Sequence, residues 1–359
     1  MTDLLSLSLE ELTQWVTETL GEPKFRAKQI YQWLHQKQAK TFGEMTNLSA
    51  ALREKLGEVG KIATVETELR LESKVDGTRK FLFRLEDGNC VETVWMEYRH
   101  GPSLCISTQV GCRMGCKFCA STLGGLVRDL TPGEMLGEVY EAQRQMGRPI
   151  SSLVLMGIGE PLDNLQNVLA FLRILSSEEG QNLSLRHVSL STCGLVDGIR
   201  ALMKERLGLT LSISLHGADD ETRSGIMPVN RRYPISELME VCREYFRVTG
   251  RRISYEYALI DGVNDSEAKA RELAGLLRGQ NCHVNLIPVN PVAERETKRS
   301  SRAAVERFVR QLGELGINAT VRRELGADIS AACGQLRRTG QGKVSAGAGL
   351  EAGARISTV

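Results

Sequence analysis

Long hydrophobic runs are absent from this 359-residue sequence. No apolar stretch reaches the roughly 18–20 residues that a membrane-spanning helix needs, so we predict no membrane association. The first six residues do not place a basic region before an apolar one, and we therefore predict no secretory signal. A large net charge is also missing. The formal net charge of +2 is too small to indicate a nucleic-acid partner, and any basic surface must be local.

An even number of cysteines, as a framework of disulfides would need, is also absent. The sequence has nine, and an odd number in a long chain without a predicted signal indicates reduced thiols and a cytoplasmic protein. Apolar residues make up 42%, which is ordinary for a globular protein and excludes disorder along the whole chain. The length suffices for one large or two smaller domains.

Four cysteines are concentrated in one short stretch. Cys105 precedes Cys112, Cys116 and Cys119, and the last three form a C-x3-C-x2-C pattern in a glycine-containing loop. Soft thiolates select zinc or iron–sulfur clusters. A structural zinc takes four ligands, and Cys105 is the only candidate for the fourth. Three thiolates leave one iron of a [4Fe–4S] cluster open to substrate. We therefore predict a cluster of the radical S-adenosylmethionine type, with zinc as the alternative.

The first hundred residues predict an accessory region in two parts. Residues 1–60 read as a small helical domain, opened by a capping box at Ser8 and Glu11. Its basic outer side either contacts RNA phosphates or is a solvated surface, and the sequence leaves both open. Residues 61–100 read as a β extension with turns at Asp76-Gly77 and Asp87-Gly88. The helices are predicted at 9–20, 26–38 and 49–56, and the strands at 66–72, 80–85 and 91–96.

From residue 101 the pattern alternates between strand and helix. About six βα units indicate a parallel sheet and suit a partial (βα)6 barrel better than a closed barrel of eight. We thus predict an α/β fold with its core at 101–338, and a Gly/Ala-rich disordered tail at 339–359. One strand is predicted before Cys112, and others at 152–156, 187–191, 209–215, 253–259, 283–288 and 319–322. The helices are predicted from Thr131 and at 164–175, 235–248, 267–277 and 301–315.

Glycines and polar residues follow successive predicted strands, where parallel sheets collect their sites. Any one of them alone is more typical of an ordinary turn, but their common register favours a ligand site. A carboxylate at Glu160 has the chemistry to pair with the ammonium of an amino-acid cofactor. The residues are Gly159, Glu160, Ser191, Ser214, Leu215, His216 and Asn290.

The remaining cysteines divide into two groups. Cys90, Cys193, Cys242 and Cys282 are interpreted as core residues, because free cysteine is commonly buried. Cys105 and Cys333 lack the apolar sequence neighbours of a core cysteine, and we expect both outside the hydrophobic core.

Six blocks of sequence stand out together: 91–94, 105–119, 157–162, 189–194, 226–230 and 328–336. With them, the chain from about residue 8 to 338 resembles the RlmN/Cfr family of radical S-adenosylmethionine RNA methyltransferases. The resemblance is closer to the RlmN branch, which methylates carbon 2 of adenosine 2503 in 23S rRNA and of adenosine 37 in some tRNAs. The Cfr branch modifies carbon 8 of the same rRNA adenosine.

The resemblance implies a site and a mechanism. Cys112, Cys116 and Cys119 match the cluster ligands, and the seven strand-end residues named above match the contacts to S-adenosylmethionine. Two molecules of this cofactor are expected per turnover. Cys333 matches a cysteine that carries the methyl group and bonds transiently to RNA. Glu92 matches the acid/base residue. Cys105 matches the thiol that releases the product and leaves a disulfide with Cys333.

The resemblance also implies partners: 23S rRNA, as naked or precursor RNA, tRNA, and a low-potential electron donor such as flavodoxin. We expect a monomer. Two other interpretations stay open: a zinc-stabilised RNA-binding protein without catalysis, and an activase that places a glycyl radical on a partner protein. Pairs of cations are candidates for phosphate contacts, although each alone is more typical of a solvated face. They are Arg231–Arg232, Arg251–Arg252, Lys298–Arg299, Arg322–Arg323 and Arg337–Arg338.

Overall fold

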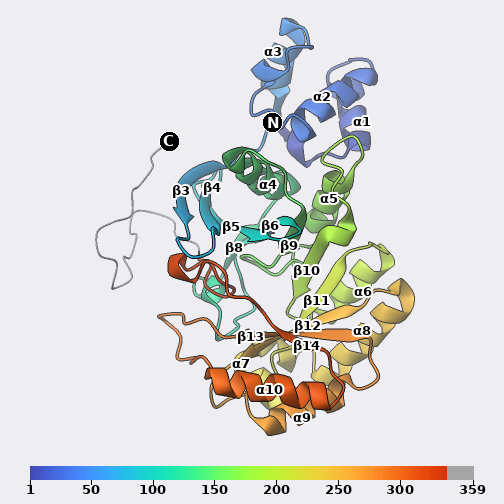
Figure 1. Cartoon of the computed structure of the whole chain (residues 1–359). Helices are drawn as coiled ribbons and strands as arrows, with labels where there is room; N and C mark the ends of the chain where they lie inside the picture. The colour runs from blue at the N-terminus through green and yellow to red at the C-terminus, as the bar shows by residue number, and fades with distance from the viewer. Residues whose placement is uncertain (338–359) are drawn as a thin grey trace.

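The computed structural model describes residues 1–337. Arg338 and the predicted disordered tail at 339–359 lie outside the described residues. Figure 1 shows α1 to α3 as a lobe at one end of the molecule, above α4, with α9 and α10 at the opposite end. None of the helices formed by residues 1–337 combines the length and the apolar character needed to cross a bilayer.

The amino-terminal lobe has the three predicted helices. The capping box is confirmed: the Ser8 side chain accepts from the amide of Glu11, whose carboxylate accepts from the amide of Ser8. Leu12 and Val16 form the buried face of the first helix. A short parallel pair of strands ties the start of the chain to the end of the lobe. The elements are α1 Leu9–Thr19, α2 Phe25–His35, α3 Ala50–Val59, β1 Thr2–Asp3 and β2 Gly60–Lys61.

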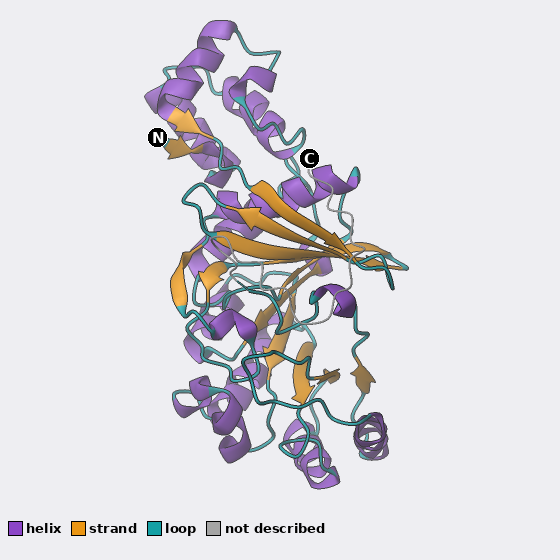
Figure 2. Cartoon of the chain, turned by 90° about the vertical axis from the view of Figure 1, so that its left-hand side faces the viewer, coloured by secondary structure: helices purple, strands orange, loops and turns teal. Residues whose placement is uncertain are grey.

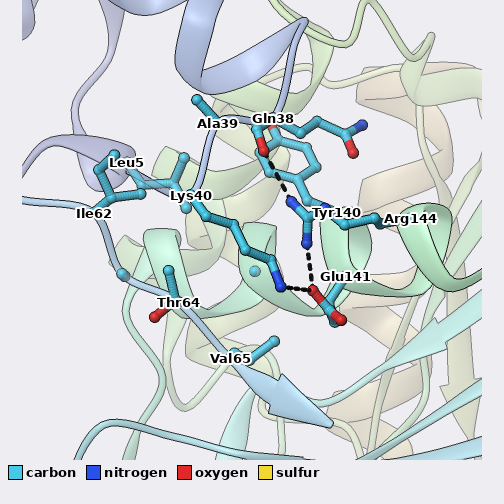
Figure 3. A pocket seen from close by; sticks show the side chains of 12 residues that line it. Leu5, Gln38, Ala39, Lys40, Ile62, Thr64, Val65, Tyr140, Glu141 and Arg144 are labelled. Carbon is cyan, nitrogen blue, oxygen red and sulfur yellow. Dashed lines mark hydrogen bonds and ion pairs between the residues drawn. The ribbon is translucent and has the colours of Figure 1, made fainter. Parts of the chain in front are cut away.

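The lobe packs on α4 (Pro132–Met146) of the core through polar contacts. Buried His35 lies with its Nδ1 2.9 Å from the hydroxyl of Tyr140. Next to it, Lys40 Nζ lies 2.7 Å from a carboxylate oxygen of Glu141. The Arg144 guanidinium pairs with the same carboxylate and donates to the Gln38 carbonyl at 2.8 Å. Figure 3 shows Lys40, Glu141 and Arg144, together with Tyr140, around a small pocket between the lobe and α4.

One ten-stranded sheet runs through the molecule, in the order β14-β13-β12-β11-β10-β9-β6-β5-β4-β3. The strands from β6 to β14 pair in parallel, whereas β3 to β6 pair antiparallel. The segment 61–100 therefore continues the core sheet. The strands are β3 Glu66–Glu72, β4 Arg79–Arg84, β5 Cys90–Tyr98, β6 Gly101–Ile106, β9 Ser152–Leu155, β10 Val188–Thr192, β11 Thr210–Ser214, β12 Ile253–Leu259, β13 Cys282–Pro288 and β14 Ala319–Val321.

Helices cover the outside of this sheet, as Figure 2 shows. Six strand-and-helix units, from β6–α4 to β13–α10, precede β14, so the predicted partial barrel is confirmed. Two helices were not predicted: α6, and α7, which is only seven residues long and polar. The further helices are α5 Leu165–Ser176, α6 Val196–Lys204, α7 Asp220–Ile226, α8 Ile235–Thr249, α9 Glu267–Leu277 and α10 Arg302–Glu314.

Candidate active site

A cavity opens at the carboxyl ends of the parallel strands, where the fold places ligand sites. Its empty volume, including the open mouth, is about 960 Å³. The wall is built by the ends of β9 to β14, by the cysteine loop after β6 and by the segment that carries Cys333. These segments bring together most of the residues that the sequence indicated for a ligand site.

The three cysteines of the C-x3-C-x2-C pattern all line this cavity. Their loop is closed by an antiparallel pair of strands that was not predicted, β7 Gln109–Gly111 and β8 Leu126–Asp129. The amide of Cys112 donates to the Gly125 carbonyl at 3.0 Å. Gly111 has φ +80°, and a Cβ there would lie 2.0 Å from that carbonyl oxygen, so only glycine fits this crossing.

Burial dominates the acid–base behaviour of these thiols. It raises the pKa of Cys112 to about 12, and it raises the pKa of Cys116 and of Cys119 as well. The negative charge of Cys119 would raise the pKa of the other two further, which places the three sulfurs near one another. Such thiols become thiolates only beside a strong positive charge, which a metal centre provides.

The donor set fits a [4Fe–4S] cluster with one open iron. Residues 1–337 contain no group of three Cys, His, Asp or Glu side chains drawn together around a single metal position. A four-iron cluster is larger than a single metal ion, and its three thiolate ligands are spread around the rim of a cavity. Cys112, Cys116 and Cys119 line the cavity in this way.

The segment after β9 passes very close to the strand before the cysteine loop. A Cβ at Gly157 would lie 2.5 Å from the Ile106 carbonyl oxygen, and Gly159 has φ +110°. Both carboxylate oxygens of the buried Glu160 accept amide protons, one from Leu162 at 3.1 Å and one from Cys193 at 2.7 Å. Burial raises the pKa of Glu160 and these amides oppose the rise. The carboxylate is thus held rigidly at the cavity wall.

The ends of β10 and β11 add polar groups to the wall. Ser191 Oγ and Ser214 Oγ lie 3.4 Å apart. His216 has φ +55° and accepts the Ala258 amide on Nδ1 at 2.9 Å, which leaves the proton of the neutral ring on Nε2. Burial lowers the pKa of His216 to about 3. Leu215 differs from its neighbours, because its side chain packs in the hydrophobic core and does not line the cavity.

Cys333 and Asn290 meet at the other side of the cavity. Asn290 Nδ2 donates to the Cys333 carbonyl at 3.0 Å, and Cys333 itself is half-buried. Glu92, on β5, does not line the cavity but lies behind this segment, where its Oε2 accepts the Arg337 amide at 2.7 Å.

The expectation that Cys105 lies outside the hydrophobic core was wrong. Its side chain is 7% exposed and packs with Val94, Ile158 and Leu336. These neighbours come from other elements, so the residues beside Cys105 in the sequence did not reveal them. Burial, followed by the charge of Cys333, raises the pKa of Cys105 to about 12. Cys105 and Cys333 therefore lie within electrostatic reach of each other.

Of the four cysteines interpreted as core residues, Cys90, Cys193 and Cys242 are buried and Cys282 is half-buried. Cys193 also lines the cavity, beside Cys116. Sequence reasoning missed this position because β10 ends far from the cysteine loop along the chain.

Two arginines of the site were not recognised from the sequence. Arg223 is fully buried and joins the strand ends by donating to the carbonyls of Leu215 and Cys193, at 3.0 and 2.6 Å. Arg322, predicted as a surface phosphate contact, instead lines the cavity with its Nη1 3.8 Å from Glu256 Oε2. The negative charge of Cys333 is the main cause that raises its pKa. Alternation along β14 gave no signal for this, because Arg322 has the same parity as Thr320, which is exposed.

The other cations give a mixed result. Arg231, Arg232, Arg252 and Lys298 are exposed, as phosphate contacts require. In the amino-terminal lobe, however, Lys28 pairs with Glu179 and Lys40 with Glu141. The basic side of that lobe is thus partly neutralised within the chain.

Comparison with known proteins identifies the class and then the family. The model of the Radical SAM superfamily matches residues 106–274, and the model of the ribosomal RNA large subunit methyltransferase N-terminal domain matches residues 2–62. The barrel, the three-thiol loop and these matches define a radical S-adenosylmethionine enzyme. A probable dual-specificity RNA methyltransferase RlmN of Lachnoclostridium phytofermentans is 54% identical over 337 residues, which is 94% of each chain. The chain belongs to the RlmN family of radical SAM RNA methyltransferases.

Other relatives agree over the same span. The corresponding RlmN of Alkaliphilus oremlandii is 54% identical over 94% of this chain and 97% of its own. The crystal structure of a radical SAM methyltransferase from Sphaerobacter thermophilus superposes with a TM-score of 0.90 at 44% identity, over 94% of this chain and 99% of that one. The family implies a [4Fe–4S] cluster and S-adenosylmethionine as cofactors.

Proposed function

We propose that this protein methylates carbon 2 of adenosine 2503 in 23S rRNA and of adenosine 37 in some tRNAs. Its relatives are named dual-specificity RNA methyltransferases, which supports two classes of RNA substrate. The observation that carries the proposal is that Cys333 lines the same cavity as the cysteine triad, with the buried Cys105 behind the cavity wall and within electrostatic reach of Cys333.

A covalent route through cysteine suits the chemistry of the target atom. Adenine carbon 2 is electron-poor and carries an inert C–H bond, so direct methyl transfer from a sulfonium fails there. When bound, the cluster and S-adenosylmethionine supply the methyl group and the radical that removes a hydrogen atom, with two cofactor molecules used per turnover. Cys333 takes up the methyl group, and its S–CH2 radical then bonds to carbon 2.

Glu92 and Cys105 complete this sequence. Glu92 removes the proton from carbon 2 of the adduct, and the unpaired electron of the adduct radical would return to the cluster when that group is bound. The Cys105 sulfur then attacks the Cys333 sulfur, the S–CH2 bond breaks and the carbon takes a proton, giving methylated RNA and a Cys105–Cys333 disulfide. A reductant must open this disulfide before the next turnover. The apolar surroundings of Cys105 support this role, because they hold the thiol protonated until a base acts on it.

The remaining residues of the cavity wall would bind the cofactors. Cys112, Cys116 and Cys119 are the proposed cluster ligands. Gly159, Glu160, Ser191, Ser214, His216 and Asn290 are the proposed contacts to S-adenosylmethionine. Leu215 can take part only through its backbone, since its side chain is in the core.

The proposed domain organisation has three parts: residues 1–60 form the accessory domain, 61–100 the β extension and 101–338 the radical SAM core. The protein acts as a monomer. The exposed cations named above contact RNA phosphates, and a low-potential donor such as flavodoxin supplies electrons.

Incubation with RNA tests the activity directly. The anaerobically reconstituted protein, protein-free 23S rRNA fragments or tRNA, S-adenosylmethionine and a reductant should give 2-methyladenosine on nucleoside mass spectrometry. Formation of 8-methyladenosine would replace the proposal by the carbon 8 reaction. Absence of both products would reject the proposal.

The covalent route has a separate test. Exchange of Cys105 for Ala should trap a protein–RNA adduct that resists denaturation, because the thiol that opens it is gone. Cys242→Ala is the matched control, since that buried cysteine lies in the core and away from the cavity. Free RNA from Cys105→Ala, with no adduct, would rule this route out.

A further inference from the structure

The segment that carries Cys333 is held on both sides by hydrogen bonds to its backbone. Before the cysteine, the amide of Gly326 donates to Asp76 Oδ2 at 2.9 Å. After it, the Ala120 amide donates to the Gly334 carbonyl at 2.7 Å, and Ser121 Oγ donates to the Leu336 carbonyl at 2.9 Å. The position of Cys333 therefore depends on contacts with the β3–β4 turn and with the cysteine loop.

One lysine joins this segment to Glu92. Lys80 Nζ lies 3.0 Å from Glu92 Oε1 and donates to the Ser330 carbonyl at 3.2 Å. The other oxygen of Glu92 accepts the Arg337 amide. Lys80 and Glu92 are 9% and 5% exposed. In the register of β4 and β5, Lys80 is opposite Val94, so it is the diagonal neighbour of Glu92 on the same face of the sheet.

Packing alone does not account for this pair. Two apolar side chains would hold β4 against β5 as well, without the cost of removing two charges from water. A buried carboxyl group left alone favours its uncharged form, which cannot take up a proton. The charged groups linked to the Glu92 carboxylate are Lys80 from β4 and Arg337 from the Cys333 segment. Glu138 from α4 lies on the other face of β5, where it accepts from the Thr93 hydroxyl. Within residues 1–337, Lys80 is the one side chain that forms an ion pair with it.

We propose that Lys80 is a positioning residue that holds the Glu92 carboxylate in place beside the Cys333 segment, and so sets the rate at which the RNA adduct loses its proton. The inference depends on the proposed function, because it assigns Lys80 to one step of that reaction. It concerns proton removal only: Lys80 does not line the cavity, so methyl transfer to Cys333 should not need it.

Single-turnover experiments on the reconstituted protein separate these steps. Intact-protein mass reports methylation of Cys333, and denaturing gels report formation and decay of the RNA adduct across a series of pH values. For Lys80→Met we expect Cys333 methylation at the wild-type rate and decay of the adduct slowed by about ten- to a hundredfold. Lys80→Arg should restore most of the rate, because an arginine at this position can keep the ion pair with Glu92.

Two further variants make the result specific. Lys80→Gln keeps a donor for the Ser330 carbonyl but has no charge, and it carries the test if Lys80→Met does not fold. Lys74→Met removes an exposed lysine from the adjoining turn and should decay as wild type does.

Wild-type decay rates in Lys80→Gln or Lys80→Met, or slowed methylation of Cys333 that accounts for the whole defect, would overturn the inference. A wild-type protein that forms neither adduct nor methylated RNA would instead reject the proposed function, before any variant is compared.

Discussion

Single buried polar side chains determine how this protein responds to pH. Glu138 on α4 is fully buried, and burial raises its pKa to about 8. Its Oε2 accepts from the Thr93 hydroxyl and, at 3.1 Å, from the Ser107 amide, whereas its Oε1 has no partner. The side chain is therefore protonated near neutral pH, in a position directly behind Glu92 and Cys105.

This protonation makes a testable contribution to stability. The folded state holds the proton of Glu138 up to about pH 8, but the unfolded chain loses it near pH 4.5. The free energy of unfolding therefore falls as pH rises through this window, by at most about 1.4 kcal/mol per pH unit. Glu138→Gln copies the protonated form and removes this loss. Urea unfolding at pH 5 to 9 should show the variant gaining on wild type as pH rises; parallel curves would contradict the assignment.

At the scale of elements, the contact between α2 and α4 fixes the amino-terminal lobe to the core. His35 and Tyr140 are both buried, and their hydrogen bond crosses the boundary between the two parts of the chain. Burial lowers the pKa of His35 to about 3, so the ring stays neutral in the folded protein. The ion pairs of Glu141 with Lys40 and Arg144 lie next to it (Figure 3).

Removal of one hydroxyl at this contact should loosen it. Tyr140→Phe leaves His35 Nδ1 buried without a partner, which should lower the free energy of unfolding by about 1–3 kcal/mol. Tyr98→Phe is the matched control, because that hydroxyl has only a weak contact at 3.9 Å with the Met96 sulfur. Equal effects of the two substitutions in denaturant melts would show that the His35 hydrogen bond does not stabilise the packing of the lobe.

At the scale of the whole molecule, the cavity exists only because distant parts of the chain meet. Cys116 belongs to the loop after β6 and Cys193 to the end of β10, yet both are buried in the same small cluster of side chains. Cys193 is also held beside Glu160, whose carboxylate accepts its amide. Proximity alone therefore does not say which of the two thiols binds iron.

Comparison of two alanine variants answers this. Cys116→Ala should lose the iron and sulfide content, and the iron-linked absorbance, of the anaerobically reconstituted protein, because a cluster needs all three thiolates of the loop. Cys193→Ala should keep both. Retention of a full cluster by Cys116→Ala, or its loss in Cys193→Ala, would mean that the ligand set includes the strand end instead.

Much of the fold was predictable because its signals are local. Strand-like and helical patterns of apolar residues predicted β3 at Glu66–Glu72, β12 at Ile253–Leu259 and α9 at Glu267–Leu277, and the structure has the same bounds. The helix α7 was missed because a seven-residue polar helix has no apolar period. The pair β7–β8 was missed because three or four residues are too few for a strand pattern.

The order of strands and helices, the cysteine triad and the polar residues at the strand ends could all be predicted, because each depends on residues that are neighbours along the chain. Three contacts became visible only in the folded chain: Cys105 among apolar side chains, Arg322 facing the cavity and Lys80 paired with Glu92. Those contacts depend on the register of the sheet and on the return of the chain from β14 to β5. No local period encodes that return, because it is set by how the whole core packs.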